Sequence, residues 1–184
     1  YITIATTGDA PDFGDLTITV TEHAGVSSPT RGIAAGGYNN SPADAYVNIM
    51  DYVEITSTGN AIDFGDLSSN RFAMSTGSSH TRGIFALGSV PSKTNLIEYV
   101  TMATKGNVVN FGDASTIRNA GTGTSNGKRA VFAGGGMDSP GTAYQNTMDY
   151  IAIASAGDAA DFGDLSVGRH ALSATSNGHG GLGL

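Results

Sequence analysis

Apolar and polar residues alternate along four similar stretches of this chain. Each stretch opens with a tyrosine, continues with alternating Ile, Val or Met, passes through a Gly followed by Asp or Asn, and closes on Asp/Asn-Phe-Gly-Asp. The stretches begin at Tyr1, Tyr52, Tyr99 and Tyr150. Their phenylalanines are Phe13, Phe64, Phe111 and Phe162. The intervals of 51, 47 and 51 residues between these phenylalanines indicate one supersecondary unit, repeated along a single domain of residues 1–184.

The unit over residues 71–113 predicts four short strands. The first covers residues 71–76, and the second, residues 82–88, is almost wholly apolar, as is typical of a strand buried on both faces. The third, residues 96–102, has apolar or aromatic side chains on both faces, which indicates a sheet packed between two other sheets. The fourth, residues 108–113, is edge-like. We expect the Gly-Asn or Gly-Asp pair before it to form a two-residue type II′ hairpin.

The variation in unit length is confined to one loop, between the second and third strands. This loop covers residues 38–51, 89–98 and 136–149 in the three units. A fixed framework with one variable loop is how repeat scaffolds present a binding face. The two longer loops mix Tyr, Asn, Asp and Ser, which suits contacts with sugars or protein surfaces, although solvated loops share this composition. The candidate ligand-binding residues are Tyr38, Asn39, Asn40, Asp44, Tyr46, Asp138 and Tyr144.

Composition narrows the class of protein. Glycine is abundant, at 27 of 184 residues, and only 14% of residues are charged, which favours an all-β fold of short strands and tight turns. The net charge of −7 argues against a nucleic-acid partner. The chain has no apolar run long enough for a membrane span, so we expect no membrane insertion. It also has no cysteine, which excludes disulfides and thiolate metal sites, and we expect no cofactor.

The glycines and aromatic residues of the unit resemble those of kelch-type repeats. The second strand closes on Gly36-Gly37 or Gly134-Gly135, a tyrosine lies in the third strand, and a large aromatic residue lies in the fourth. This chain has Phe where kelch blades usually have Trp, and Leu87-Gly88 replaces one Gly-Gly pair. The repeat is also similar to kelch-like arrays in virion and tail-associated proteins of tailed bacteriophages. The resemblance implies a β-propeller of four-stranded blades at an extracellular or virion surface.

The two ends of the chain carry complementary half-units. Residues 1–15 supply a third and a fourth strand, and residues 165–184 supply a first and a second. These halves can pair to make one blade, which predicts a closed four-bladed ring. A longer array interrupted at the same places predicts part of a larger ring instead.

Two repeated sets of charged residues are candidates for ion binding. The Asp-Phe-Gly-Asp motif could hold calcium, but its spacing differs from that of calcium loops in propellers, so we expect these Asp residues to cap turns and to charge an exposed edge. Arginines recur at the start of the predicted second strands, which we take as innermost, and of the first strands (Arg31, Arg82 and Arg129; Arg71, Arg118 and Arg169). They could bind an anion in a channel, but we expect them to pair with the repeated Asp residues.

Motifs for catalysis or transition metals are weak. The four histidines show no spacing typical of a zinc site. Residues 123–127 spell the Gly-x-Ser-x-Gly nucleophile elbow, but that motif requires a following helix, and here a strand is predicted, so we interpret it as a repeated turn.

Three functions remain open from the sequence. The first is a non-catalytic module that presents its loops for adhesion or receptor binding, with glycans as one ligand class. The second is a purely structural block that contacts other chains of a larger assembly. The third is a glycan-active hydrolase or lyase with its site at the mouth of the channel.

Overall fold

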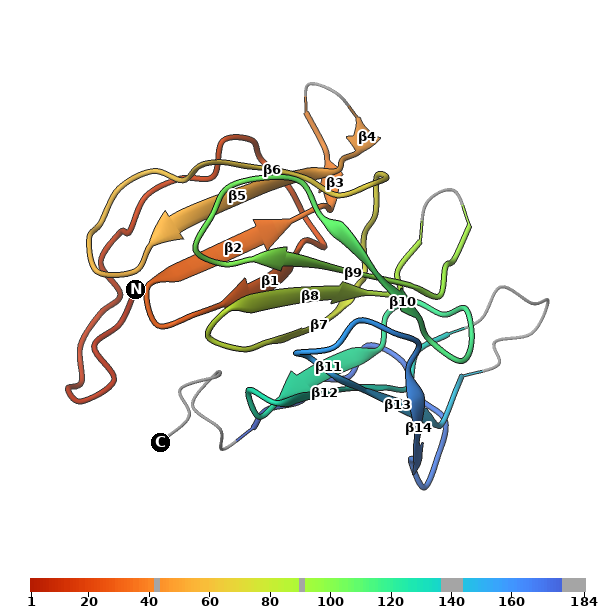
Figure 1. Ribbon diagram of the computed structural model, residues 1–184. Helices are drawn as coiled ribbons and strands as arrows, with labels where there is room; N and C mark the ends of the chain where they lie inside the picture. Colours follow the sequence, from red (N-terminus) through yellow and green to blue (C-terminus); the bar gives the residue numbers. More distant parts are fainter. Residues whose placement is uncertain (42–43, 90–91, 137–143, 177–184) are drawn as a thin grey trace.

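The computed structural model describes residues 1–41, 44–89, 92–136 and 144–176, and in these ranges the chain is all-β (Figure 1). The strands form three four-stranded antiparallel sheets and one two-stranded sheet. No helix in the described ranges is long and apolar enough to cross a membrane.

Each four-stranded sheet is a meander whose strands pair in chain order. The first sheet contains β1 (Ala24–Ser27), β2 (Arg31–Ala35), β5 (Ile49–Glu54) and β6 (Ile62–Asp66). The second contains β7 (Ser75–Ser78), β8 (Arg82–Ala86), β9 (Leu96–Thr101) and β10 (Val109–Asp113). The third contains β11 (Thr122–Ser125), β12 (Arg129–Ala133), β13 (Thr147–Ala152) and β14 (Ala160–Asp164). The two-stranded sheet pairs β3 (Tyr38–Asn39) with β4 (Ala45–Tyr46).

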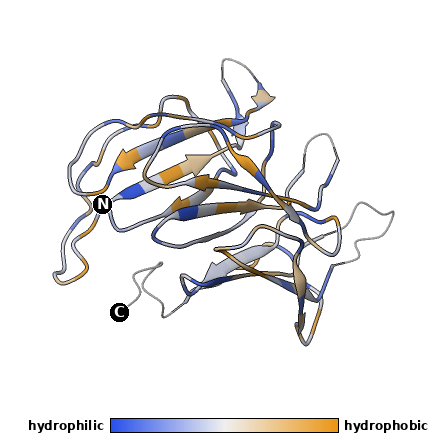
Figure 2. Ribbon diagram, in the orientation of Figure 1, coloured by the Kyte–Doolittle hydropathy of each residue, from blue (hydrophilic) through white to orange (hydrophobic). Residues whose placement is uncertain are grey.

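The second sheet lies between the other two, as its pattern predicted. Phe85 and Val100 pack into a buried cluster with residues of the first sheet. Ile84 and Ile97, on the opposite face, pack into a second cluster with Phe132 of the third sheet. Apolar residues, orange in Figure 2, recur along the strands of all three sheets. The sheets are therefore stacked so that each internal face is buried against a neighbour.

The predicted first strand is displaced along the chain. β7 covers Ser75–Ser78 rather than residues 71–76, because Ala73 has a φ of 52°, in the left-handed region, which a strand cannot contain. Ala120 and Ala171 repeat this conformation, with φ of 51° and 52°.

The first strands, not the second, are innermost. Because β1, β7 and β11 are each an edge of their sheet, they can approach one another across the sheets. The backbone N–H of Ser78 donates to Oγ of Ser125 at 3.0 Å, and a Cβ added to Gly123 would lie 2.0 Å from the carbonyl oxygen of Thr76. The prediction that placed the second strands innermost was therefore wrong.

The recurring Gly-Asn or Gly-Asp pair does not form a two-residue hairpin. The third and fourth strands are joined by residues 55–61, 102–108 and 153–159. Within these loops the glycine N–H bonds to the preceding unit, from Gly59 to the Phe13 carbonyl at 2.8 Å, from Gly106 to that of Phe64 at 2.8 Å, and from Gly157 to that of Phe111 at 2.7 Å. The Gly-Asn or Gly-Asp pair therefore joins consecutive units, and the prediction of a type II′ hairpin was wrong.

The N-terminal half-unit, residues 1–15, keeps the hairpin geometry without forming assigned strands. Its Tyr1 and Phe13 rings meet edge to face at 5.9 Å, and the corresponding pairs in the other units lie at 5.7 to 6.0 Å. The Tyr1 amino group donates to the Pro11 carbonyl at 2.9 Å. Pro11 has no N–H, so it cannot donate the second of the two backbone hydrogen bonds that join paired residues in an antiparallel sheet. Residues 165–176 also form no assigned strand, and residues 177–184 lie outside the described residues.

Candidate functional site

The β3–β4 hairpin carries an aromatic stack that consists of Tyr38, Tyr46 and Phe72. Tyr38 and Tyr46 are directly paired across the hairpin, and their ring centroids are 4.9 Å apart. Tyr46 in turn lies flat on Phe72, at 4.5 Å with an interplanar angle of 17°. The Tyr46 side chain remains 37% exposed, so the stack presents an aromatic surface to solvent.

A carboxylate lies at the edge of this aromatic stack. The Tyr38 hydroxyl donates a hydrogen bond to Asp44, which itself adopts a left-handed φ of 47°. This hydrogen bond and the negative charge of Asp44 raise the pKa of Tyr38 above its ordinary value. Polar and aromatic groups therefore converge at the hairpin, an arrangement that can stack on a sugar ring and hydrogen-bond its hydroxyls.

The two asparagines of the hairpin differ in exposure. Asn39 is only 3% exposed, and its Oδ1 accepts from the Ser41 backbone N–H at 2.9 Å, a bond that shapes the turn. Asn40 is exposed. The structure thus brings together Tyr38, Asp44 and Tyr46 at the surface, whereas Asn39 is buried.

The third unit repeats part of this arrangement. Tyr144 stacks on His170 with ring centroids 4.3 Å apart and an angle of 14°. Tyr144 corresponds to Tyr46, and His170 to Phe72. Asp138, the remaining predicted site residue, lies outside the described residues.

No known protein family matches this chain, and no curated protein matches it.

A second repeated feature is a buried acid immediately before each internal tyrosine: Asp51, Glu98 and Asp149. Arg71 pairs with Glu98, and Arg118 Nη1 lies 2.9 Å from Asp149 Oδ2, with both of the latter side chains fully buried. Burial lowers the pKa of Arg71, while the charge of Glu98 acts in the opposite direction. The prediction that these arginines pair with the Asp-Phe-Gly-Asp residues is wrong, because the buried acid lies closer.

The first sheet lacks the arginine of this ion pair. Val20 occupies the position of Arg71 and Arg118, and Asp51 is bonded by Thr17, as Asp149 is by the equivalent Ser115. The Thr17 backbone N–H donates at 2.9 Å, and its hydroxyl lies 2.8 Å from Oδ1 and 2.7 Å from Oδ2.

The other arginine set binds aromatic rings and neighbouring units. The guanidinium groups of Arg31, Arg82 and Arg129 lie 4.9, 4.4 and 4.9 Å from the ring centres of Tyr52, Tyr99 and Tyr150, respectively. Nη1 of Arg31 also donates to the Met102 carbonyl at 3.1 Å, and that of Arg82 to the Ile153 carbonyl at 2.8 Å. The acid that Arg31 contacts is Glu54, at 2.7 Å. Arg31 and Arg82 therefore join consecutive units rather than pairing with the repeated Asp residues.

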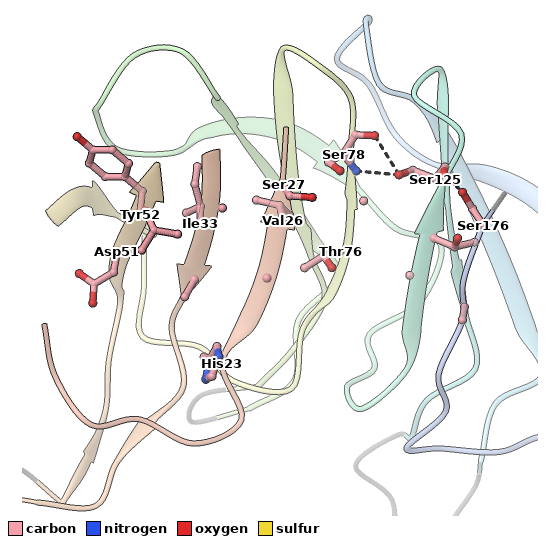
Figure 3. Close-up of a pocket in the computed structure, with 18 of the residues that line it drawn as sticks. His23, Val26, Ser27, Ile33, Asp51, Tyr52, Thr76, Ser78, Ser125 and Ser176 are labelled. Carbon is pink, nitrogen blue, oxygen red and sulfur yellow. Dashed lines mark hydrogen bonds between the residues drawn. The ribbon is translucent and has the colours of Figure 1, made fainter. Parts of the chain in front are cut away.

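A cavity of about 540 Å³ lies where the inner segments of the chain converge (Figure 3). Its walls include Ser27, Ser78, Ser125 and Ser176, which occupy equivalent positions in four successive units. The Ser125 hydroxyl donates to the Ser78 carbonyl at 2.9 Å, and that of Ser176 to the Ser125 carbonyl at 2.6 Å. Ser125 ends β11 and is followed by β12 rather than a helix, so residues 123–127 form no nucleophile elbow. The interpretation of the whole segment as a turn is only partly right, because residues 123–125 belong to β11 and the turn covers residues 126–128. The lining mixes apolar side chains, such as Leu16 and Ile33, with hydroxyl groups, and it has single acidic and imidazole groups at Asp51 and His23.

The described residues contain no group of three His, Asp or Glu side chains placed to hold a metal ion. A calcium site at the repeated Asp-Phe-Gly-Asp motif therefore has no geometric support in this part of the chain.

Proposed function

We propose that this chain is a non-catalytic binding module that presents its loops between the second and third strands for adhesion or receptor recognition at an extracellular or virion surface. Glycans are the ligand class that best fits the β3–β4 hairpin. The observation that carries this proposal is the aromatic stack of Tyr38, Tyr46 and Phe72, partly exposed and bordered by the Asp44 carboxylate.

Recurrence of an aromatic pair in a second loop supports this proposal. Tyr144 on His170 repeats the stack of Tyr46 on Phe72, and Tyr144 is 44% exposed. An array that offers two similar platforms can bind a repeating ligand at two points, which raises the overall affinity well above that of one platform.

The fold proposed for this module is a kelch-like β-propeller, either a closed four-bladed ring or part of a larger ring. Its support is the convergence of four equivalent inner segments on one cavity, together with the same junction between each pair of successive units. Such radial packing leaves only short sheet edges exposed.

Binding to a glycan array and to immobilised receptor candidates tests the function. A ligand found in this way should bind the Tyr46→Ala variant roughly 5- to 150-fold more weakly, taking the contribution of about 1–3 kcal/mol that stacking of a nucleic-acid base on an aromatic ring makes as the guide for a sugar ring. Ile62→Ala is the matched control, since Ile62 is 55% exposed in the neighbouring β6 and lies outside the aromatic stack.

Other results would favour a different function. Binding that Tyr46→Ala leaves unchanged would contradict a site at the hairpin, and the absence of any small ligand would favour a structural block in an assembly. Turnover of a glycan, abolished by changing the cavity-lining Asp51 to Asn, would instead establish a hydrolase or lyase.

A further inference from the structure

The stacked sheets have two chemically different faces. We call the face toward the preceding unit the leading face and the face toward the following unit the trailing face. In the second sheet the leading face includes Val100 and Met102, and the trailing face includes Ile97 and Phe111. Each internal interface therefore joins a trailing face to a leading face.

The trailing face of the third sheet has no such partner among the described residues. Phe162, which is equivalent to Phe64 and Phe111, is 51% exposed, whereas those two residues are 1% and 3% exposed. An apolar groove of about 450 Å³ lies beside it, lined in part by Val131, Met148 and Leu172. The same kind of surface is thus buried twice inside the molecule and left open once.

The N-terminal half-unit has the complementary open surface. Ile2 and Ile4 occupy the leading-face positions of Val100 and Met102, which are 2% and 1% exposed in the second sheet. Ile2 and Ile4 themselves are 65% and 95% exposed. An apolar pair that is buried in the internal units therefore lies in solvent here.

The backbone contact that joins consecutive units is also unpaired at both ends of the array: the third sheet offers one of its two segments, and the N-terminal half-unit offers the other. In the internal junctions a Cβ on Gly65 or Gly112 would lie 2.4 Å from the glycine carbonyl oxygen of the next unit. The equivalent Gly163 has no backbone atom of another described unit so close, since its nearest neighbour is the Met148 methyl at 4.0 Å. The matching Gly8-Asp9 pair lies in residues 1–15, and within the described residues the Gly8 N–H makes no backbone hydrogen bond to another unit.

We propose that the trailing face of the third sheet binds the leading face of the N-terminal half-unit of a second copy of this chain. Phe162 and Met148 would then cover Ile2 and Ile4, and Gly8-Asp9 would bond to residues 162–164 as Gly157-Asp158 bonds to residues 111–113. The contact is heterologous, so it extends the array from copy to copy or closes a larger ring.

The N-terminal half-unit of the same chain lies against the first sheet through its trailing side. It is fixed to the first sheet by bonds from the Gly59 N–H to the Phe13 carbonyl and from the Ala61 N–H to the Asp15 carbonyl, both 2.8 Å. With these bonds made, the cavity of about 540 Å³ separates the first sheet from residues 174–176. A second copy can reach Phe162 without breaking either bond. The proposal is independent of what the β3–β4 hairpin binds.

Sedimentation velocity over a range of concentrations tests the association. The chain should self-associate, and Phe162→Asp or Ile4→Asp should weaken the association at least about tenfold, because each places a charge in the centre of an apolar contact. Val109→Asp is the matched control, since Val109 is 53% exposed in β10 and lies outside the proposed contact, and it should associate as the unmodified chain does. Circular dichroism of each variant checks that the sheets are retained.

Disulfide trapping identifies the geometry, and the chain has no cysteine of its own. Asp9→Cys and Asp164→Cys on separate chains should cross-link into a dimer. The internal pair Asp15→Cys with Asn60→Cys is the positive control, because the Asp15 N–H already bonds to Asn60 Oδ1 at 3.0 Å. A chain that stays monomeric overturns the proposal, even where Asp9→Cys and Asp164→Cys cross-link within one chain. Association that Phe162→Asp leaves unchanged also overturns it.

Discussion

The buried acid before each internal tyrosine shows how one position can be satisfied in two ways. In the third unit Asp149 is paired with Arg118, and both side chains are fully buried. In the first unit Asp51 is bonded by Thr17, and Val20 stands in place of the arginine. Ser115, which is equivalent to Thr17, also donates to Asp149, at 2.7 Å, so the hydroxyl partner is kept and the arginine is what the first unit lacks.

Replacing the acid should therefore cost different amounts in the two units. Asp149→Asn leaves a buried guanidinium without its counter-charge, and we expect a loss of about 3–5 kcal/mol in the free energy of unfolding. Asp51→Asn keeps an acceptor for Thr17 and strands no cation, so the expected loss is about 1–2 kcal/mol. Urea denaturation of both variants gives the comparison, and equal losses would show that the Arg118 pair adds nothing.

Tyr38 carries a pH-dependent contribution to stability. The folded-state pKa of Tyr38 is raised above 10.0 because its hydroxyl donates to the Asp44 carboxylate. Since the folded pKa exceeds the unfolded one, this contribution is fully present below pH 10 and is lost as the pH rises through the folded-state pKa. A difference titration of tyrosinate absorbance against Tyr38→Phe should show Tyr38 ionising later than a free tyrosine.

Asp44→Asn is the control for this titration. It keeps the phenol but removes the charge, so the Tyr38 titration should move back toward the ordinary value. A titration of Tyr38 that is the same with Asp44 and with Asn at that position would exclude the carboxylate charge as the cause, because the Asn side-chain oxygen can still accept the hydrogen bond.

For single residues, the sequence predicted the surface residues of the candidate site better than the side chains they contact. Tyr38, Asp44 and Tyr46 stood out by composition, and the structure brings them together. Phe72 and His170 were missed because the stacking position changes residue type, and in the second unit the two positions hold Lys93 and Asn119. The buried acid was missed for a similar reason, since it alternates between Asp and Glu.

Strands with an alternating apolar pattern were predictable, whereas the turns were not. The second, third and fourth strands of the unit fall within one or two residues of their predicted bounds. The first strand was displaced because the left-handed φ of Ala73 has no sequence signal, alanine being an unusual residue there. The Gly-Asn pair suggested a local turn, but its backbone groups bond to another unit, a long-range use that composition does not reveal.

The glycine junction between units should tolerate no side chain on one of its two sides. In Gly112→Ala the added Cβ would meet the Gly157 carbonyl oxygen at 2.4 Å, at a φ of +151°, so the junction must open, at an expected cost of about 3 kcal/mol or more. Gly157→Ala has a similar φ of +154° but nothing within 4 Å, and it should cost only the backbone strain, about 1–2 kcal/mol. Chemical denaturation measures both, and a Gly157→Ala variant as unstable as Gly112→Ala would argue that conformation, not contact, sets the requirement.

On the scale of the whole molecule, the sheets depend on one another. The second sheet contributes one face to each of the two buried clusters, and Arg31 and Arg82 bond to carbonyls 71 residues further along the chain. Each unit is thus stabilised mainly by its immediate neighbours, as in other repeat arrays. The sequence predicted this dependence because apolar residues on both faces of a strand require cover on both sides.

A phenylalanine at the same strand position should therefore contribute differently to the free energy of unfolding in different units. Phe111 in β10 is covered by the third sheet and is 3% exposed, whereas Phe162 in β14 is 51% exposed. Phe111→Ala should lower the free energy of unfolding by about 3–5 kcal/mol, since it empties a filled space between two sheets. Phe162→Ala should lower it by about 1 kcal/mol or less when measured at a concentration at which the chain is monomeric, because little of its ring is removed from water. The difference should shrink as the protein concentration rises, since association through the trailing face would bury Phe162 and link its loss to the stability of the folded state. Equal effects of the two substitutions in the monomer would mean that the third sheet is already covered, and the end of the array would then not be open.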